Sequence, residues 1–138
     1  MKLKTEQPRY VLDSSAVIAL VRREQGWEKV NAALDRSVIS AINLAESMTK
    51  LIRQGGEPRL VERLLRALDL EVIPWDEELA WASRDLCALA WTNGISLADR
   101  ACLTLARHLD LAAMTADLQW KKLSHGVKVY LFREGKRE

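Results

Sequence analysis

The sequence has few of the residues from which soft-metal sites and disulfides are built. Only 2 cysteines and 2 histidines occur among its 138 residues. Cys87 and Cys102 lie among apolar residues and lack CxxC spacing. The spacing disfavours a zinc site, and the apolar neighbours predict thiols that pack in the core. Reduced thiols are typical of the cytoplasm, where we expect this protein to reside.

Long hydrophobic runs are also missing. Charged residues interrupt every apolar stretch well before the roughly 20 residues that a membrane-spanning helix needs, and residues 1–10 lack the apolar segment of a signal peptide. We therefore expect no membrane partner. A hydrophobic content of 49% suffices for the core of one domain. We expect this domain to span residues 1–138, with flexible tails at 1–8 and 133–138.

Short β-type segments alternate with helical patterns along the chain. Strands are predicted at residues 9–12, 38–39, 70–74, 111–115 and 127–132. Helices are predicted at residues 15–25, 28–34, 41–54, 58–68, 76–93, 96–108 and 116–123. This alternation indicates a parallel sheet covered on both faces. The predicted fold class is α/β, a sandwich around a mainly parallel sheet of four to five strands.

Four acidic residues have mostly small or apolar neighbours in the sequence: Asp13 in VLDSS, Glu46 in NLAES, Asp99 in SLADR and Asp117 in MTADLQW. Carboxylates are seldom buried unless a cation or hydrogen-bond donors compensate them. Asp13 and Asp117 each follow a predicted strand, at the edge where ligands bind in such sheets. Glu46 and Asp99 fall near helix beginnings. We expect the four side chains to converge in one crevice.

Each acid also has a purely structural interpretation. Asp13 and Asp117 could cap the helices that follow them, although Ser14 and Ser15 already offer cap oxygens after Asp13. Asp99 resembles the acidic member of a capping box, and Glu46 could lie at a helix edge. A further acid follows a strand, Asp76, and we interpret it as a cap.

Converging carboxylates constrain the choice of metal. Carboxylates within a few Å raise each other's pKa and need a cation to remain ionised together. Because the candidate ligands are oxygens without histidine or cysteine partners, the sequence favours a hard ion, Mg²⁺ or else Mn²⁺.

At these residues the chain resembles the PIN-domain nucleases, and among them the VapC-type toxins of bacterial and archaeal toxin–antitoxin pairs. The matching segments are VLDSSAVIALVRRE, ISAINLAESMTKLIRQG, GISLADRACLTLA and MTADLQW. They occur in the order typical of the family, within a match that runs from Tyr10 to Leu131. The resemblance implies a PIN-like three-layer α/β/α sandwich and the activity of a metal-dependent endoribonuclease.

The resemblance also implies a role for each site residue. The catalytic residues would be Asp13, Glu46, Asp99 and Asp117. The three aspartates would hold Mg²⁺, and Glu46 would bind it through water or help to activate the attacking water. Ser15 and Thr115 match positions that orient the carboxylates. Since the nucleophile would be water, cleavage should leave a 5′-phosphate and a 3′-hydroxyl.

The implied partners are RNA, a cognate antitoxin that covers the acidic pocket, and a second copy of the chain in a homodimer. Trp81 and Trp91 lie on one predicted helix, and exposed indole surface there would suit a dimer or partner face.

Candidate substrate contacts lie beside the acids. Arg100 adjoins Asp99, and Trp120, Lys121 and Lys122 follow Asp117. Stacking rings together with cations are how single-stranded nucleic acids are held. Packing of Trp120 on the sheet and a helix-surface role for Arg100 are the alternatives.

Two other functions remain open. One is a catalytically inactive PIN-like module that binds RNA or protein, which the intact set of acids disfavours. The other is an aspartyl-phosphate phosphatase or a receiver-type α/β protein. The phosphatase pattern requires a second aspartate where Ser15 stands, and receiver domains need a second early acid and a late lysine that we do not find.

Overall fold

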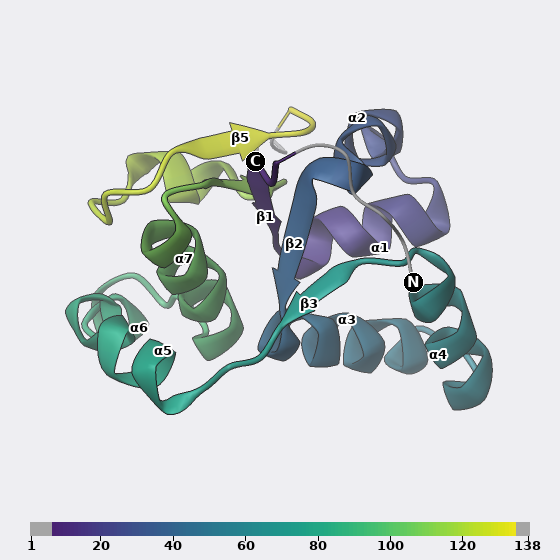
Figure 1. Ribbon diagram of the computed structural model, residues 1–138, viewed down its shortest axis with the longest axis horizontal. Helices are drawn as coiled ribbons and strands as arrows, with labels where there is room; N and C mark the ends of the chain where they lie inside the picture. Colours follow the sequence, from purple (N-terminus) through teal and green to yellow (C-terminus); the bar gives the residue numbers. More distant parts are fainter. Residues whose placement is uncertain (1–6, 135–138) are drawn as a thin grey trace.

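The computed structural model describes residues 7–134 of the chain (Figure 1). Its elements are β1 (Tyr10–Leu12), α1 (Ser14–Arg22), α2 (Trp27–Ala33), η1 (Leu34–Arg36), β2 (Ser37–Ser40), α3 (Ala41–Arg53), α4 (Pro58–Ala67), β3 (Glu71–Ile73), α5 (Glu77–Ala82), η2 (Ser83–Leu86), α6 (Leu89–Thr92), α7 (Leu97–Leu109), β4 (Ala112–Thr115), η3 (Leu118–Lys122) and β5 (Val129–Leu131). Of the expected tails, residues 1–6 and 135–138 lie outside the described part.

The sheet is parallel throughout its described strands. Their order is β3-β2-β1-β4-β5, so β1 lies at the centre. Leu12 of β1 pairs with Ile39 of β2 on one side and with Met114 of β4 on the other. Because at least one helix separates every two consecutive strands, each connection crosses back over the sheet and leaves the next strand parallel. The predicted α/β class is confirmed.

Two hydrophobic clusters cover the two faces of the sheet. Val11 belongs to the cluster beneath α5 and α7, whereas the next residue, Leu12, belongs to the cluster beneath α1 to α4. The same alternation occurs at Val38 and Ile39 of β2, because successive strand residues point to opposite faces. In Figure 1 the sheet lies between α1, α3 and α4 on one side and α5, α6 and α7 on the other. The three-layer α/β/α arrangement is therefore confirmed.

The single helix predicted at residues 76–93 is wrong, because the structure divides this segment into α5, η2 and α6. The hydroxyl of Ser83 donates to the carbonyl of Ala80 at 2.7 Å, and such local bonds compete with the helical ladder. Trp81 and Trp91 consequently lie on separate helices. Both indoles are exposed, with accessible fractions of 68% and 76%.

The helices between residues 7 and 134 are each too short or too polar to cross a lipid bilayer.

Gly26 allows a close approach between the start of α2 and the end of the sheet. It has a φ of +88°, and a Cβ at this position would lie 2.5 Å from the carbonyl oxygen of Phe132. The ring of Phe132, which follows β5, would be 2.9 Å away. Phe132 is fully buried. The missing side chain therefore lets the segment after β5 seal the core.

Replacing Gly26 with alanine should destabilise the protein more than the same change at Gly94. Gly94 has a φ of +67° with no atom within 4 Å of its virtual Cβ, so Gly94→Ala reports the conformational cost alone, about 1–2 kcal/mol. Gly26→Ala adds an overlap with backbone, and we expect a further loss of about 1–3 kcal/mol. Urea unfolding of both variants measures the difference. Equal losses would show that Phe132 moves away freely.

Candidate functional site

Asp13 is a buried carboxylate at the end of the central strand. Its Oδ1 accepts hydrogen bonds from the Ser15 amide at 2.7 Å, the Ser15 hydroxyl at 2.5 Å and the Ala16 amide at 3.3 Å. Its Oδ2 accepts one from the Thr115 hydroxyl at 2.7 Å. Only 4% of the residue is exposed. Both residues expected to orient a carboxylate thus donate to Asp13.

The structural interpretation of Asp13 as a helix cap is confirmed, because Asp13 is the N-cap of α1, and the expectation that Ser14 and Ser15 make this acid unnecessary for capping is wrong. Capping alone does not account for a carboxylate here, since asparagine caps equally well without a buried charge. Burial raises the pKa of Asp13, although the hydrogen bonds from Ser15 and Thr115 act in the opposite direction. An acid retained against this desolvation points to binding of a cation or a proton.

Glu46 faces the N-terminus of α1 from α3. Its Oε1 accepts a hydrogen bond from the Ser14 hydroxyl at 2.5 Å, and the Lys50 ammonium lies 3.9 Å from its Oε2. Lys50 also donates to the Ser14 hydroxyl oxygen at 3.3 Å. Sequence reasoning assigned neither partner to Glu46. The available signal was the spacing of Glu46 and Lys50, since residues four apart are neighbours on a helix.

Asp99 lies in the first turn of α7, where the Ser96 hydroxyl accepts a hydrogen bond from its amide at 3.1 Å. The serine half of the predicted capping box is therefore confirmed, because the Ser96 hydroxyl caps α7. Burial raises the pKa of Asp99 to about 6, and the negative charges of Asp13, Glu46 and Asp117 contribute to the rise. The four predicted acids consequently share one electrostatic environment at the carboxyl edge of the sheet.

Asp117 is the most exposed of the four acids. It is the N-cap of η3, where its Oδ1 accepts a hydrogen bond from the Gln119 amide at 2.9 Å. Its own amide donates to the Thr115 hydroxyl at 3.0 Å. Because the Thr115 hydroxyl in turn donates to Asp13, one side chain connects the two aspartates that follow β1 and β4.

Asn43 connects the helices that carry Glu46 and Asp99. Its Nδ2 donates to the carbonyl of Ala98 at 2.9 Å, and the residue is fully buried. Its Oδ1 has no hydrogen-bond partner among the described residues. Sequence reasoning missed this residue, because its partner lies 55 positions away.

The donor chemistry of the site suits a hydrated hard cation. Among residues 7–134, no group of three or more His, Cys, Asp and Glu side chains is arranged so that it could hold a metal ion. The side chains as they stand do not form the predicted set of three aspartate ligands. Mg²⁺, however, keeps several waters and needs only one or two carboxylates. Such a cation would also offset the repulsion that raises the pKa of Asp99.

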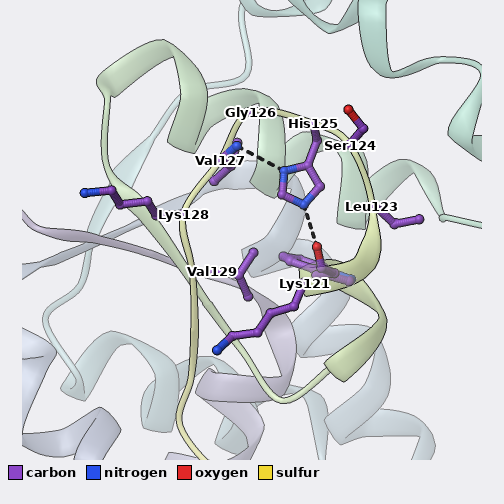
Figure 2. Close-up of a pocket in the computed structure, with 9 residues that line it drawn as sticks. Lys121, Leu123, Ser124, His125, Gly126, Val127, Lys128 and Val129 are labelled. Atoms are coloured by element: carbon purple, nitrogen blue, oxygen red, sulfur yellow. Dashed lines mark hydrogen bonds between the residues drawn. The ribbon is translucent and has the colours of Figure 1, made fainter.

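Trp120 does not reach the site, so its predicted role as a stacking platform is wrong. The ring is completely buried in the cluster beneath α7, which leaves no face for a base. His125 holds the loop beside it: its Nε2 lies 2.7 Å from the Trp120 carbonyl oxygen, and its Nδ1 accepts from the Val127 amide at 3.1 Å (Figure 2). The packing alternative therefore holds for Trp120.

The three predicted cationic contacts differ in whether their charged groups are already hydrogen-bonded or exposed to solvent. One guanidinium nitrogen of the half-buried Arg100 donates to the Ile95 carbonyl at 2.7 Å and thereby braces the loop before α7. Lys121 and Lys122 at the end of η3 are exposed. Lys121 also lines an open pocket of about 420 Å³ with Trp120 and residues 123–129, and none of the four acids lines it.

Comparison with known proteins identifies similar folds. A family model described as the PIN domain matches residues 10–126. No curated protein matches the sequence. The structure is similar to the DNA-bound VapBC complex from Salmonella typhimurium, with a TM-score of 0.70 at 20% identity over 92% of this chain and 100% of that chain.

Two other solved structures show the same fold. FitAcB from Neisseria gonorrhoeae has a TM-score of 0.65 at 24% identity and covers 88% of this chain and 96% of its own. VapC20 from Mycobacterium tuberculosis, a sarcin–ricin loop cleaving toxin, has a TM-score of 0.64 at 15% identity. The match covers 84% of this chain and 97% of that one.

Replacing Asp99 with asparagine should stabilise the protein in EDTA near neutral pH. Its pKa is raised from 3.8 to about 6, so between these two pH values the folded state retains a proton that the unfolded chain has released. The protein is therefore most stable below the unfolded pKa, where Asp99 is neutral in both states. It loses this stability as the pH rises through about 6, because the buried carboxylate then becomes charged. After allowance for solvent screening, we expect Asp99→Asn to gain about 1–2 kcal/mol at about pH 7.5 and almost nothing at about pH 4. Urea unfolding at both pH values tests this, and a pH-independent difference would contradict it.

Proposed function

Because this chain belongs to the PIN domain family, we propose that it is a Mg²⁺-dependent endoribonuclease that serves as the toxin of a toxin–antitoxin pair. The observation that carries the proposal is the shared environment of four carboxylates, in which burial and the charges of the other three acids raise the pKa of Asp99. An oxygen-only set of this kind suits metal-assisted phosphodiester hydrolysis.

The similar structures support the toxin assignment. A further similar structure is a toxin–antitoxin complex from Klebsiella pneumoniae, and VapC20 is a sarcin–ricin loop cleaving toxin. By analogy we propose RNA as substrate and an antitoxin protein as partner for this chain. We further propose that it works in the cytoplasm as a single domain and as a homodimer, for which the exposed Trp81 and Trp91 offer apolar contact surface.

Each acid has a task in the proposed reaction. A bound Mg²⁺ would supply charge neutralisation and an activated water. Asp13, Asp99 and Asp117 would hold the ion, one or two of them directly and the rest through its water ligands, and the bonds from Ser15 and Thr115 keep Asp13 in one orientation. Glu46 is partly exposed, and we propose that its carboxylate accepts a proton from the attacking water.

The cationic side chains would contact the substrate away from the scissile bond. Lys121 and Lys122 are exposed and lie within five residues of Asp117, so they are proposed to bind the RNA phosphates. Arg100 is proposed as a weaker contact because its guanidinium already bonds to Ile95.

Asp13→Asn should abolish Mg²⁺-dependent cleavage of single-stranded RNA while preserving the fold, since asparagine retains the cap. We expect a loss of at least the roughly 100-fold that removal of an outer-shell partner of a metal site can cost. Asp76→Asn is the matched control, because Asp76 also caps a helix, through a 2.9 Å bond from the Leu79 amide, but is not among the four acids. Cleavage rates on an end-labelled RNA measure both effects.

The RNA products and the effect of EDTA are the measurements that can contradict the proposed hydrolysis. Mapping the RNA ends should give a 5′-phosphate and a 3′-hydroxyl, whereas 2′,3′-cyclic phosphates or undiminished cutting in EDTA would refute water as the nucleophile. If the wild-type protein binds RNA without cutting it, and Asp13→Asn binds equally well, the protein is a binding module. Growth arrest on expression, relieved by Asp13→Asn, is the expected result in cells.

A further inference from the structure

Lys50 reaches from the second half of α3 to the beginning of α1. Its ammonium donates to the Ser14 hydroxyl oxygen at 3.3 Å and lies 3.9 Å from Oε2 of Glu46. Ser14 is 2% exposed, and its hydroxyl donates to Oε1 of Glu46 at 2.5 Å. The three side chains therefore form a closed triangle on the wall of the acidic site.

The direction of these hydrogen bonds is fixed by the number of protons available. The Ser14 hydroxyl has a single proton, and this proton is given to Glu46. The lysine ammonium has donors only, so its bond to Ser14 must end on the serine oxygen. A cation at that oxygen polarises the O–H group toward the carboxylate and strengthens the bond to Glu46.

An ion pair four residues apart on a helix surface would by itself contribute little. Two features distinguish Lys50 from such a pair. Ser14 adjoins Asp13, so the triangle attaches the Glu46 carboxylate to the first turn of the helix that Asp13 caps. Glu46 also belongs to the group of acids whose charges act on Asp99. A positive charge at Lys50 therefore acts inside this group.

We propose that Lys50 is a positioning residue of the nuclease site, which orients Glu46 through Ser14 and offsets part of the negative charge that the four acids present to a divalent cation. The claim that Lys50 orients Glu46 for catalysis rests on the proposed function. The claim that Lys50 offsets negative charge concerns only the binding of the metal.

This arrangement predicts opposite effects on metal binding and catalysis. Lys50→Met makes the site more negative by one charge, so Mn²⁺ should bind about 2- to 5-fold more tightly, the range of such ion-pair energies. The same change weakens the Ser14 bond that orients the Glu46 carboxylate, so kcat for RNA cleavage should fall about 10-fold, as for loss of an outer-shell partner, with KM nearly unchanged. A residue that only stabilised the fold would not tighten metal binding.

Two variants separate charge from orientation. Lys50→Arg keeps the charge, and we expect it to restore wild-type Mn²⁺ affinity and part of kcat. Ser14→Ala removes the bond to Glu46 without changing the charge, so kcat should fall while Mn²⁺ affinity stays within about 2-fold of wild type. The matched control is Arg66→Met, which removes another ion pair of the same spacing, between Arg66 and Glu62 at 2.8 Å on α4.

The experiment titrates each chelator-treated, full-length protein with Mn²⁺ in a calorimeter, without RNA, and then measures kcat and KM for a single-stranded RNA in Mg²⁺. Thermal unfolding verifies that every variant is folded. If Lys50→Met matches Arg66→Met in both Mn²⁺ affinity and kcat, the proposal is wrong. A rise in KM alone would place Lys50 in substrate binding and would also overturn it.

Failure of the nuclease function can be recognised separately. If the wild-type protein binds Mn²⁺ but cuts no RNA, the proposed function fails, and tighter Mn²⁺ binding by Lys50→Met still supports the electrostatic part. If the wild-type protein does not bind Mn²⁺ at all, both proposals are overturned.

Discussion

The arrangement of the site depends on how the Asp13 carboxylate is accommodated in the protein interior. A carboxylate buried at the end of the central strand is tolerated only when donors surround it. The fold supplies them from two elements, the first turn of α1 through Ser15 and Ala16 and the end of β4 through Thr115. These donors fix the start of α1 and the position of β4 beside β1. Asp13 is thus both a functional candidate and a structural junction.

The hydrogen bonds do not fully compensate the burial of the Asp13 carboxylate. Hydrogen bonds lower the pKa of Asp13, yet burial dominates and raises it, and burial together with the neighbouring negative charges raises the pKa of Asp99. A set of acids selected for stability alone would not combine burial with mutual repulsion. The fully buried Asn43 holds two of these acids in position, because it bonds α3 to the first turn of α7. A buried hydrogen bond thus joins the two helices whose acids repel each other.

The sequence predicted the features that local patterns determine. The strands ending before Asp13 and Asp117 are apolar and short, and the rule that ligands gather at the carboxyl edge placed both acids correctly. Contacts between distant segments could not be predicted. The bond from Ser14 to Glu46 spans 32 positions and the bond from Asn43 to Ala98 spans 55, and no local pattern encodes either.

Two wrong predictions have similar physical causes. The leucines of residues 76–93 continue a helical pattern through the turn at Ser83, so periodicity could not reveal the break. Trp120 stands next to two lysines, which suggested an exposed rim. The lysines are indeed exposed, but the indole turns inward and fills the core beneath α7. Neighbouring residues in a short 3₁₀ helix point in different directions, so the exposure of one says little about the next.

The adjacent serines after Asp13 show how finely the first turn of α1 is specified. As possible caps they appeared interchangeable, but the hydroxyl of Ser15 donates to Asp13, whereas that of Ser14 donates to Glu46. One residue of helix rotates a side chain by about 100°. This rotation directs the two hydroxyls to different acids, and a shift of one position would leave each carboxylate with the wrong donor. The register of this turn, set by the cap at Asp13, therefore determines the orientation of Glu46 as well.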